Sequence, residues 1–259
     1  MFGLFNKTPC LDETSSQWLL DTFSWAQKNF NSDLFYSHTV LVLPNNQFFP
    51  GKVDSVDRMA NLIFDQVKQY AAISHWPTRI EDQNTCTITN QPEIKLSRAI
   101  RDPQGVADPS IDDSLRILIP YNPLQINKPE VMISSFAHIL SHYMAKTTEE
   151  LPPGGAEYWP HATELLAIFL GFGIMFANSA FTFRGGCGSC YNAQSNREAY
   201  LSELEATYAL AIFTVLKEIP VSNVSKHLKK HLRSFFKKAI KEISEKNEEK
   251  QPGIDHDQS

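Results

Sequence analysis

Cysteine is scarce in this sequence, and neither a flexible linker nor an apolar leader segment is present. Four cysteines among 259 residues are too few for a disulfide-based scaffold. No Gly/Ser-rich or Pro-rich stretch divides the chain, which predicts one domain over residues 1–246 and a disordered charged tail over residues 247–259. The opening residues, MFGLFNK, lack the apolar run of a signal peptide. We therefore expect a cytoplasmic protein.

The chain also lacks an excess of positive charge. It has 24 Lys and Arg residues against 29 Asp and Glu residues, which gives a formal net charge of -5. This balance excludes a surface-wide nucleic-acid binder. Hydrophobic residues make up 42% of the chain and charged residues 20%, so there is enough apolar material for a large core. The composition predicts a folded protein without a nucleic-acid partner.

One stretch, residues 165–183, is long and apolar enough to suggest a membrane span. It reads LLAIFLGFGIMFANSAFTF and carries no charge. His161 and Glu164 stand at one end, Asn178 and Ser179 lie inside it, and the sequence has no second stretch of this kind. A helix that is apolar on every side is also typical of the centre of a large helical core. These features favour a buried core helix over a membrane span.

Hydrophobic spacing and capping residues predict a mainly helical chain. Helices are expected over residues 15–30, 54–72, 129–146, 160–183, 200–219 and 222–246. Short β-branched runs predict strands over residues 39–43, 85–89 and 115–119. The predicted fold class is therefore α+β, with a mainly helical core and a small β-sheet in the N-terminal half.

Two histidines on the helix expected over residues 129–146 are spaced for metal chelation. His138 and His142 are four residues apart, which places both imidazoles on one helix face, one turn apart. The next helix supplies Glu164 near its start, and His161 precedes it by one turn. Together, His138, His142 and Glu164 would leave a fourth metal position for water, with His161 as a substitute or supporting group. Alternatively, both histidines are polar residues of a half-buried helix, hydrogen-bonded to their neighbours.

The order of these residues resembles a known enzyme family. A helix with His-x-x-x-His, a short loop and a helix with Glu is similar to the gluzincin type of zincin metallopeptidases, whose signature is His-Glu-x-x-His with a downstream Glu. Most of the chain also resembles an uncharacterised bacterial family that carries an intact zincin motif, through the runs WLLDTFSWAQKNF, LVLPNNQFFP, SSFAHILSHYM, TELLAIFLGFGIMFANSAF and YLSELEATYALAIF. The resemblance implies a zincin-like core and a zinc ion held at the positions of His138, His142 and Glu164.

At the position of the motif glutamate this sequence has Ile139. In zincin peptidases, that glutamate takes a proton from the metal-bound water and passes it to the leaving amine. Isoleucine cannot ionise, so ordinary peptidase chemistry is not expected. The resulting prediction is a zincin-like protein that binds a divalent metal, is degenerate as a peptidase, and acts by binding or scaffolding a protein or peptide partner.

Two other interpretations remain open. An active metal-dependent hydrolase would need another base, for which Glu205, Glu203 and His161 are the candidates. For Glu203 a solvated helix face is the simpler expectation, whereas Glu205 is flanked by apolar turns. The third interpretation is a metal-free structural or interaction protein, for which the apolar helix or the basic tail offers a route to membrane association.

The run RGGCGSCY contains a Cys-x-x-Cys pair, Cys187 and Cys190. Such a pair is half of a zinc site or a redox pair, and a full tetrathiolate site would need the distant Cys10 and Cys86. Because the pair follows the apolar helix and not a strand, a thioredoxin-like site is not expected. We interpret the pair as incidental or modestly redox-active thiols in an exposed loop, with a metal or disulfide clip as the alternative.

The last predicted helix is rich in basic residues. Its apolar positions alternate with Lys226, Lys229, Lys230, Arg233, Lys237 and Lys238. Such a helix could lie on an anionic membrane or contact nucleic acid. Four acidic residues follow directly and partly cancel the positive field, namely Glu242, Glu245, Glu248 and Glu249. We therefore favour a solvated outer helix over peripheral membrane contact.

Overall fold

The structure is a computed structural model that describes residues 8–51, 53–86, 99–184 and 200–250. It confirms an α+β, mainly helical fold with a small sheet in the N-terminal half. The helices are α1 (Glu13–Asn29), α2 (Ser32–Ser37), α3 (Val56–Tyr70), α4 (Pro129–Ala145), α5 (Trp159–Ala167), α6 (Gly173–Arg184), α7 (Glu203–Leu216), α8 (Val221–Ser225) and α9 (Leu232–Lys250). The strands are β1 (Thr78–Asp82) and β2 (Ile117–Tyr121), and the short helical turns are η1 (Asp113–Leu115), η2 (Pro123–Asn127), η3 (Ala156–Tyr158) and the π-helical η4 (Ile168–Phe172).

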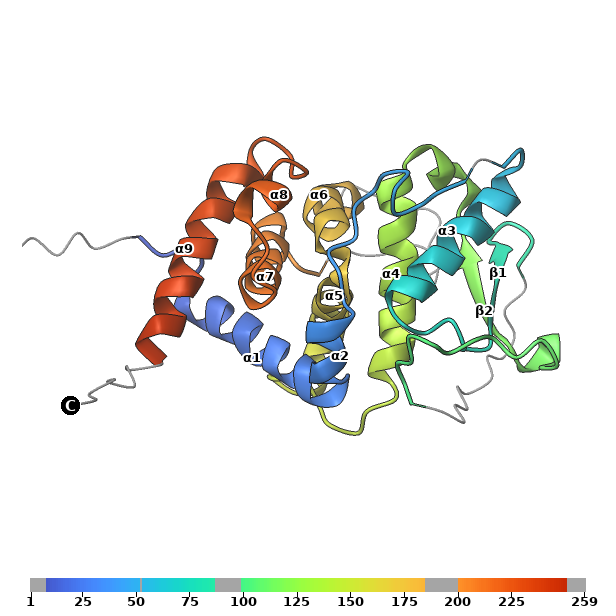
Figure 1. Cartoon of the computed structure of the whole chain (residues 1–259), viewed down its shortest axis with the longest axis horizontal. Helices are drawn as coiled ribbons and strands as arrows, with labels where there is room; N and C mark the ends of the chain where they lie inside the picture. Colours follow the sequence, from blue (N-terminus) through green and yellow to red (C-terminus); the bar gives the residue numbers. More distant parts are fainter. Residues whose placement is uncertain (1–7, 52, 87–98, 185–199, 251–259) are drawn as a thin grey trace, which may run out of the picture.

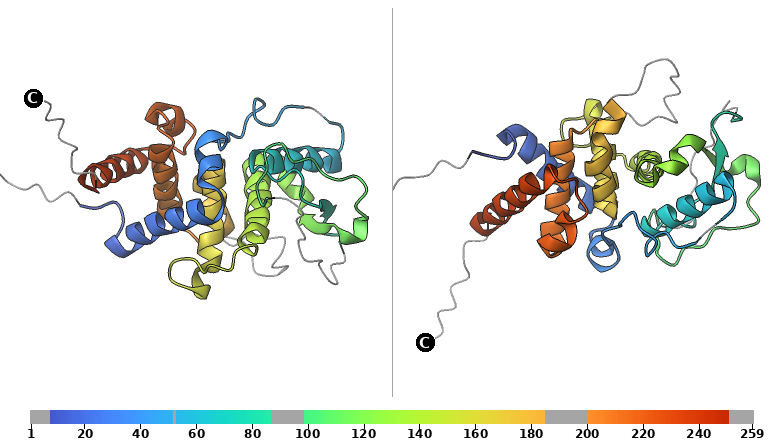
Figure 2. Two further views of the ribbon diagram at one scale, coloured as in Figure 1. Left: turned by 60° about the horizontal axis from the view of Figure 1, so that its bottom comes forward. Right: turned by 90° about the horizontal axis from the view of Figure 1, so that it is seen from above.

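The main helices stand side by side along the long axis of the molecule (Figure 1). The row begins at one end with α9, which packs on α7, and α7 in turn packs on α6. On the side of α5 and α6 that faces away from α7 lies α4. The other end is formed by α3 and the two strands, and the turned views show the same order (Figure 2). This arrangement places α4 and α5, which carry the predicted metal ligands, in the middle of the row.

Two helices begin close to the residues expected from the sequence. Ser55 caps α3 and Pro129 lies in the first turn of α4, as expected. The start of α1 differs from the prediction, which begins this helix at residue 15. The N-cap is Asp12, whose carboxylate accepts the Ser15 N–H at 2.8 Å. Aspartate is as good a cap as serine, so the helix begins two residues earlier than expected.

The long charge-free stretch forms the central helix of the core. The elements α5, η4 and α6 follow one another directly in the sequence, with a kink at Gly171, and every residue from 162 to 180 is buried. By length and composition, the helical run Ala156–Ala180 could cross a membrane, and its apolar window is entirely buried inside this protein. The burial is that expected of a core helix.

Gly171 produces a kink in the central helical run, because its backbone angles are not helical. Its φ is +102°, and its carbonyl accepts the N–H of Val42 at 3.0 Å. A Cβ atom at this position would lie 2.1 Å from the carbonyl oxygen of Val40, so only glycine allows the approach. The predicted strand over residues 39–43 is therefore wrong, because this segment is bonded to the helix and not to another strand.

Within the described residues the sheet has two parallel strands. β1 pairs with β2 in a register that runs from Thr78 opposite Ile117 to Asp82 opposite Tyr121. The strand predicted over residues 115–119 is confirmed with a shift of two residues, whereas no pattern indicates β1, because three of its five residues are charged. Of the strand predicted over residues 85–89, the first two positions are not in a strand and the rest lie outside the described residues.

The C-terminal segment forms two helices where one was predicted over residues 222–246. Asn178 of α6 holds the turn that separates α8 from α9. Its amide nitrogen donates to the carbonyl of His227 at 2.9 Å, and its amide oxygen accepts the N–H of Lys229 at 2.9 Å. These two bonds satisfy backbone groups that a continuous helix would have paired internally, so the break is stabilised from a distant part of the chain.

The predicted tail begins later than expected. α9 continues to Lys250, so residues 247–250 are helical. Residues 251–259, the remainder of the predicted tail, lie outside the described part of the chain.

Candidate functional site

Both histidines of the predicted metal site lie on α4. The helix is anchored by buried apolar residues such as Phe136 and Leu140, and it packs against α3, α5 and α6. His138 is half-buried and His142, one turn later, is exposed. The helical spacing that suggested chelation is therefore present, with one imidazole nearer the core than the other.

Glu164 is fully buried in the middle of the molecule. It lies in α5, which packs directly against α4, and its exposed fraction is 0%. Its carboxylate oxygen Oε2 accepts the backbone N–H of Leu201 at 2.8 Å. Burying a carboxylate costs free energy unless hydrogen bonds or a cation compensate the charge. The Leu201 bond supplies part of that compensation and fixes the segment that leads into α7.

His161 lies one turn before Glu164, inside a cluster of aromatic rings. Its ring centroid is 6.1 Å from that of Trp18, 5.7 Å from that of Tyr158 and 5.6 Å from that of Tyr200. Its buried Nδ1 atom has no hydrogen-bond partner among the residues that the structure describes. The cluster holds the imidazole in place and leaves one polar nitrogen unsatisfied, which is uncommon in a protein interior.

The three predicted ligands do not converge in this structure. Among the described residues, no group of three or more His, Cys, Asp or Glu side chains is placed to hold a metal ion. The donor types of His138, His142 and Glu164 suit a divalent ion such as zinc, and they lie on two helices that touch. The donor set therefore fits the metal, whereas the side-chain positions form no closed coordination sphere.

The pKa of His142 is lowered from its ordinary value. Partial desolvation of its ring is the main cause, and the positive charge of Lys146 adds to the effect. The neutral imidazole is the form that binds a metal. His142 therefore keeps the metal-binding form at pH values where an ordinary histidine begins to take up a proton.

Ile139 lies between the two histidines in the sequence and packs, partly buried, against the hydrophobic core. Its side chain offers neither a proton acceptor nor a hydrogen-bond partner. The arrangement around α4 can therefore bind an ion or a ligand, but position 139 cannot take a proton from water.

Glu203 and Glu205, the candidate replacement bases, both have structural partners at the start of α7. Glu205 accepts the N–H of Ser202 at 2.7 Å, and Ser202 Oγ accepts the N–H of Glu205 at 3.1 Å, which completes a capping box. Glu203 lies 3.3 Å from His231 and 3.9 Å from Lys229. Local structure thus explains both carboxylates, and neither contact points to a role as a base.

Cys10 and Cys86 are free, half-buried thiols. Burial and the neighbouring Glu242 raise the pKa of Cys10 to about 11, and burial also raises the pKa of Cys86. A thiol with a raised pKa is protonated at neutral pH, and is then a poor nucleophile and metal ligand. Cys187 and Cys190, the Cys-x-x-Cys pair, lie outside the described residues.

Sequence reasoning missed the contacts that surround Glu164 and His161. Leu201 and Tyr200 reach α5 from the segment before α7, and Trp18 reaches it from α1. These contacts join segments that are far apart in the chain, and a backbone N–H has no residue-specific signature. The aromatic residues were visible in the sequence, but nothing in their spacing indicated that they meet.

Comparison of the chain with protein-family models, curated proteins and solved structures finds no match. The resemblance to zincins therefore rests on the quoted residues and stays a prediction. The geometry adds that the two histidines and the buried glutamate lie on neighbouring helices.

Proposed function

We propose that this protein is a zincin-like metal-binding protein without peptidase activity, which holds a divalent ion, zinc, through His138, His142 and Glu164. The packing of α4, with two histidines one turn apart, against α5, with a fully buried carboxylate, is the observation that carries the proposal. Two imidazoles and one carboxylate form a donor set that proteins use for zinc, with one position left open.

The protein environment supports this role at two of the proposed ligands. The lowered pKa of His142 favours its neutral form, and the Leu201 N–H orients the Glu164 carboxylate, as hydrogen bonds commonly orient metal ligands. Because the side chains do not converge in this structure, binding through all three requires side chains of α4 or α5 to rotate. A bound divalent ion would supply positive charge beside Glu164 and would tie α4 to α5.

The residue at position 139 directs the proposal toward binding and away from hydrolysis. Peptide hydrolysis needs a group that accepts a proton from the attacking water, and Ile139 cannot do so. The resembled family acts on peptides, so the proposed partner is a protein or a peptide that is held without being cleaved.

Zinc-dependent thermal unfolding tests the metal site. A ligand that binds only the folded state raises the Tm, so zinc should raise the Tm of metal-free wild type, and chelation should reverse the rise. His138→Ala and His142→Ala should remove the response. His231→Ala is the matched control, because His231 is an exposed histidine of the α8–α9 turn that pairs with Glu203. Equal responses in all four proteins would contradict the proposed ligands.

Restoring the motif glutamate tests the zincin arrangement separately. Ile139→Glu should give measurable, zinc-dependent cleavage of a peptide substrate, because it returns a proton acceptor to the helix. Ile139→Gln, which has a similar shape but cannot accept the proton, is the control and should stay inactive. A folded Ile139→Glu variant that binds zinc and cleaves nothing would count against zincin geometry.

The bond between Glu164 and Leu201 favours a second candidate, a metal-free structural or interaction protein. In that case the buried carboxylate serves to hold the segment before α7 through the 2.8 Å hydrogen bond. Glu164→Gln keeps an acceptor oxygen and removes the charge, so this variant should retain the wild-type stability, and zinc should not change the Tm of the wild type. A zinc response that Glu164→Gln abolishes would support the metal proposal instead.

A further inference from the structure

The segment from Lys226 to Lys241 is strongly basic in a chain of net charge -5. It contains seven Lys and Arg residues, two His residues and no Asp or Glu. All seven basic residues are exposed and lie in the turn before α9 or on α9 itself, namely Lys226, Lys229, Lys230, Arg233, Lys237, Lys238 and Lys241. The rest of the chain is therefore acidic, and positive charge is concentrated at one end of the molecule (Figure 1).

Helical spacing aligns part of this set. Arg233, Lys237 and Lys241 are exposed and recur every four residues, about one turn apart along α9, and Lys226 and Lys230 lie just before the helix. The opposite face of α9 carries buried apolar residues and packs on α7. We call Lys226, Lys230, Arg233, Lys237 and Lys241 the basic stripe.

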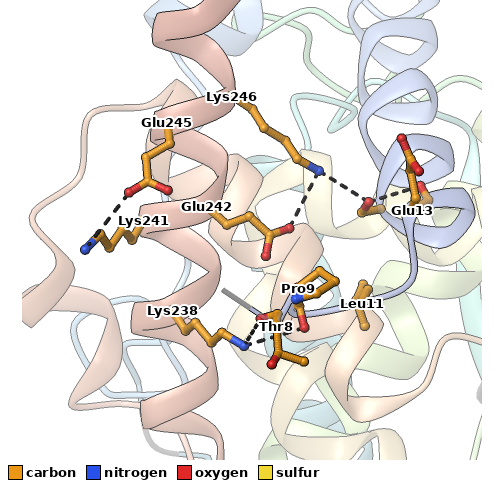
Figure 3. A pocket seen from close by; sticks show the side chains of 10 residues that line it. Thr8, Pro9, Leu11, Glu13, Lys238, Lys241, Glu242, Glu245 and Lys246 are labelled. Carbon is orange, nitrogen blue, oxygen red and sulfur yellow. Dashed lines mark hydrogen bonds and ion pairs between the residues drawn. The ribbon is translucent and has the colours of Figure 1, made fainter. Parts of the chain in front are cut away.

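The acidic residue that follows the stripe directly is engaged elsewhere. The Glu242 carboxylate accepts the N–H of Cys10 at 2.8 Å and the O–H of Tyr208 at 3.0 Å, and it lies 3.6 Å from Lys246. Figure 3 shows Glu242 and Lys246 pointing into a pocket of about 320 Å³ that α9 forms with the start of α1 and the N-terminal segment. Its charge is therefore turned inward, and it cancels less of the positive field than the sequence suggested.

The other contacts leave most of the positive charge in place. Lys241 lies 4.0 Å from Glu245 in an exposed pair, a type of contact that contributes little. Arg233 donates to the carbonyl of Leu228 at 2.9 Å, which leaves its charge uncompensated. Among the described residues, Lys226, Lys230 and Lys237 form no ion pair with an acidic side chain.

We propose that the basic stripe docks the protein on an anionic phospholipid bilayer. Clusters of Lys and Arg on an amphipathic helix are attracted to anionic headgroups. Three stripe residues lie on α9 and two lie in the turn just before it. Because α9 stands at one end of the molecule (Figures 1 and 2), this exposed set suits a flat charged surface. Large exposed apolar side chains are not found on the described part of α9, so the contact is electrostatic and reversible. The acidic remainder of the chain disfavours a polyanion that would wrap around the protein.

Vesicle co-sedimentation of the full chain tests this proposal. The wild type should pellet with vesicles that contain about 30% phosphatidylserine in phosphatidylcholine, and should stay in solution with phosphatidylcholine alone. Salt at about 0.5 M should release it. The triple variant Lys230→Glu, Lys237→Glu and Lys241→Glu should bind at least about 100-fold more weakly, because each lost basic residue costs roughly a factor of five and the added carboxylates are repelled by the anionic leaflet.

The matched control makes the same change in net charge away from the stripe. Lys28→Glu, Arg58→Glu and Lys128→Glu replace three exposed basic residues on other elements, and this variant should keep most of the binding. Circular dichroism should show both triple variants folded. No binding of the wild type to anionic vesicles would overturn the proposal, as would equal losses in both variants. Tighter binding to a random DNA duplex than to the vesicles would also overturn it, in favour of nucleic acid.

Discussion

Arg101 is a buried cation whose hydrogen bonds all go to uncharged acceptors in the described structure. It is 4% exposed, and it donates to the carbonyls of Ala71 at 3.1 Å and Phe30 at 3.2 Å and to Thr39 Oγ1 at 2.9 Å. Phe30 and Ala71 are the C-caps of α1 and α3, where carbonyls lack helical partners and the helix dipole is negative. The guanidinium thus joins two helix ends, and burial lowers its pKa to about 10.

Replacing Arg101 should be costly. Arg101→Met keeps an unbranched side chain but leaves the two buried carbonyls without a donor, so the free energy of unfolding should fall by about 3–5 kcal/mol. Arg58→Met is the control, because Arg58 is exposed and pairs with Asp54 at 3.1 Å. The free energy of unfolding of Arg58→Met should fall by less than about 1 kcal/mol. Urea denaturation of both variants measures the difference, and similar small losses would contradict the capping role.

Lys68 is a second buried cation, and its titration affects stability. It is 6% exposed, and its ammonium group donates to the carbonyl of Trp76 at 2.9 Å. Burial lowers the pKa of Lys68 to about 8, an effect that Asp65 partly opposes and Arg116 reinforces. An unfolded lysine titrates near 10.4, as a rough reference. Between these two values the unfolded chain binds the proton more strongly than the folded protein does, so stability rises with pH in that window.

We expect the difference in free energy of unfolding between the wild type and Lys68→Met to depend on pH. The free energy of unfolding of the wild type should rise by about 3 kcal/mol relative to the variant between pH 7 and pH 10.5. The difference should be constant below pH 7, where both states are protonated. Lys237→Met, at an exposed position, is the control and should show no such rise. If the difference in free energy of unfolding between the wild type and Lys68→Met did not change across this pH range, the lowered pKa of Lys68 would be refuted.

At the scale of elements, the sequence predicted what adjacent residues determine. Ser55 and Pro129 act within their own helices, and α3 and α4 begin where these residues indicate. The segment 39–43 has the composition of a strand, but its bonding partner is Gly171, which lies far along the chain. Similarly, Asn178, which belongs to α6, holds the turn that separates α8 from α9. Such long-range contacts leave no local pattern to detect.

The close approach at Gly171 gives a prediction for the kink in the central helical run. Gly171→Ala combines a φ of +102° with a Cβ atom 2.1 Å from the Val40 carbonyl oxygen, so it should cost more than about 3 kcal/mol of stability. Gly155→Ala has a φ of +87° but no atom within 4 Å of the added Cβ. Its cost should be backbone strain alone, about 1–3 kcal/mol. If chemical denaturation showed the same loss of stability in both variants, the close approach between Gly171 and the Val40 carbonyl would not add to the cost of the substitution.

At the scale of the whole molecule, the candidate site was predictable in part. The histidine spacing belongs to one helix, so the sequence was enough to place His138 and His142 on the same face. Glu164 lies near the start of the next long helix, which also made it a reasonable neighbour. The exposure of each imidazole, the Leu201 bond and the aromatic cluster around His161 depend on how distant helices pack, which no local spacing encodes.

The two proposed roles lie in different parts of the molecule. The metal ligands are on α4 and α5 in the middle of the helical row, whereas the basic stripe is on α9 at one end (Figure 1). Variants of one site should therefore leave the other unchanged, since distant and independent sites usually behave additively. The stripe variant should keep its zinc response, and His138→Ala should keep its binding to anionic vesicles.

Metal content is the most direct test of the central claim. Protein purified without a metal-affinity tag should contain about one equivalent of zinc by mass spectrometry, as should the control His231→Ala. His138→Ala and His142→Ala should both lose it. Wild-type protein that holds no metal, even after incubation with zinc and removal of the excess, would contradict the proposed site and leave the metal-free interaction protein as the better account.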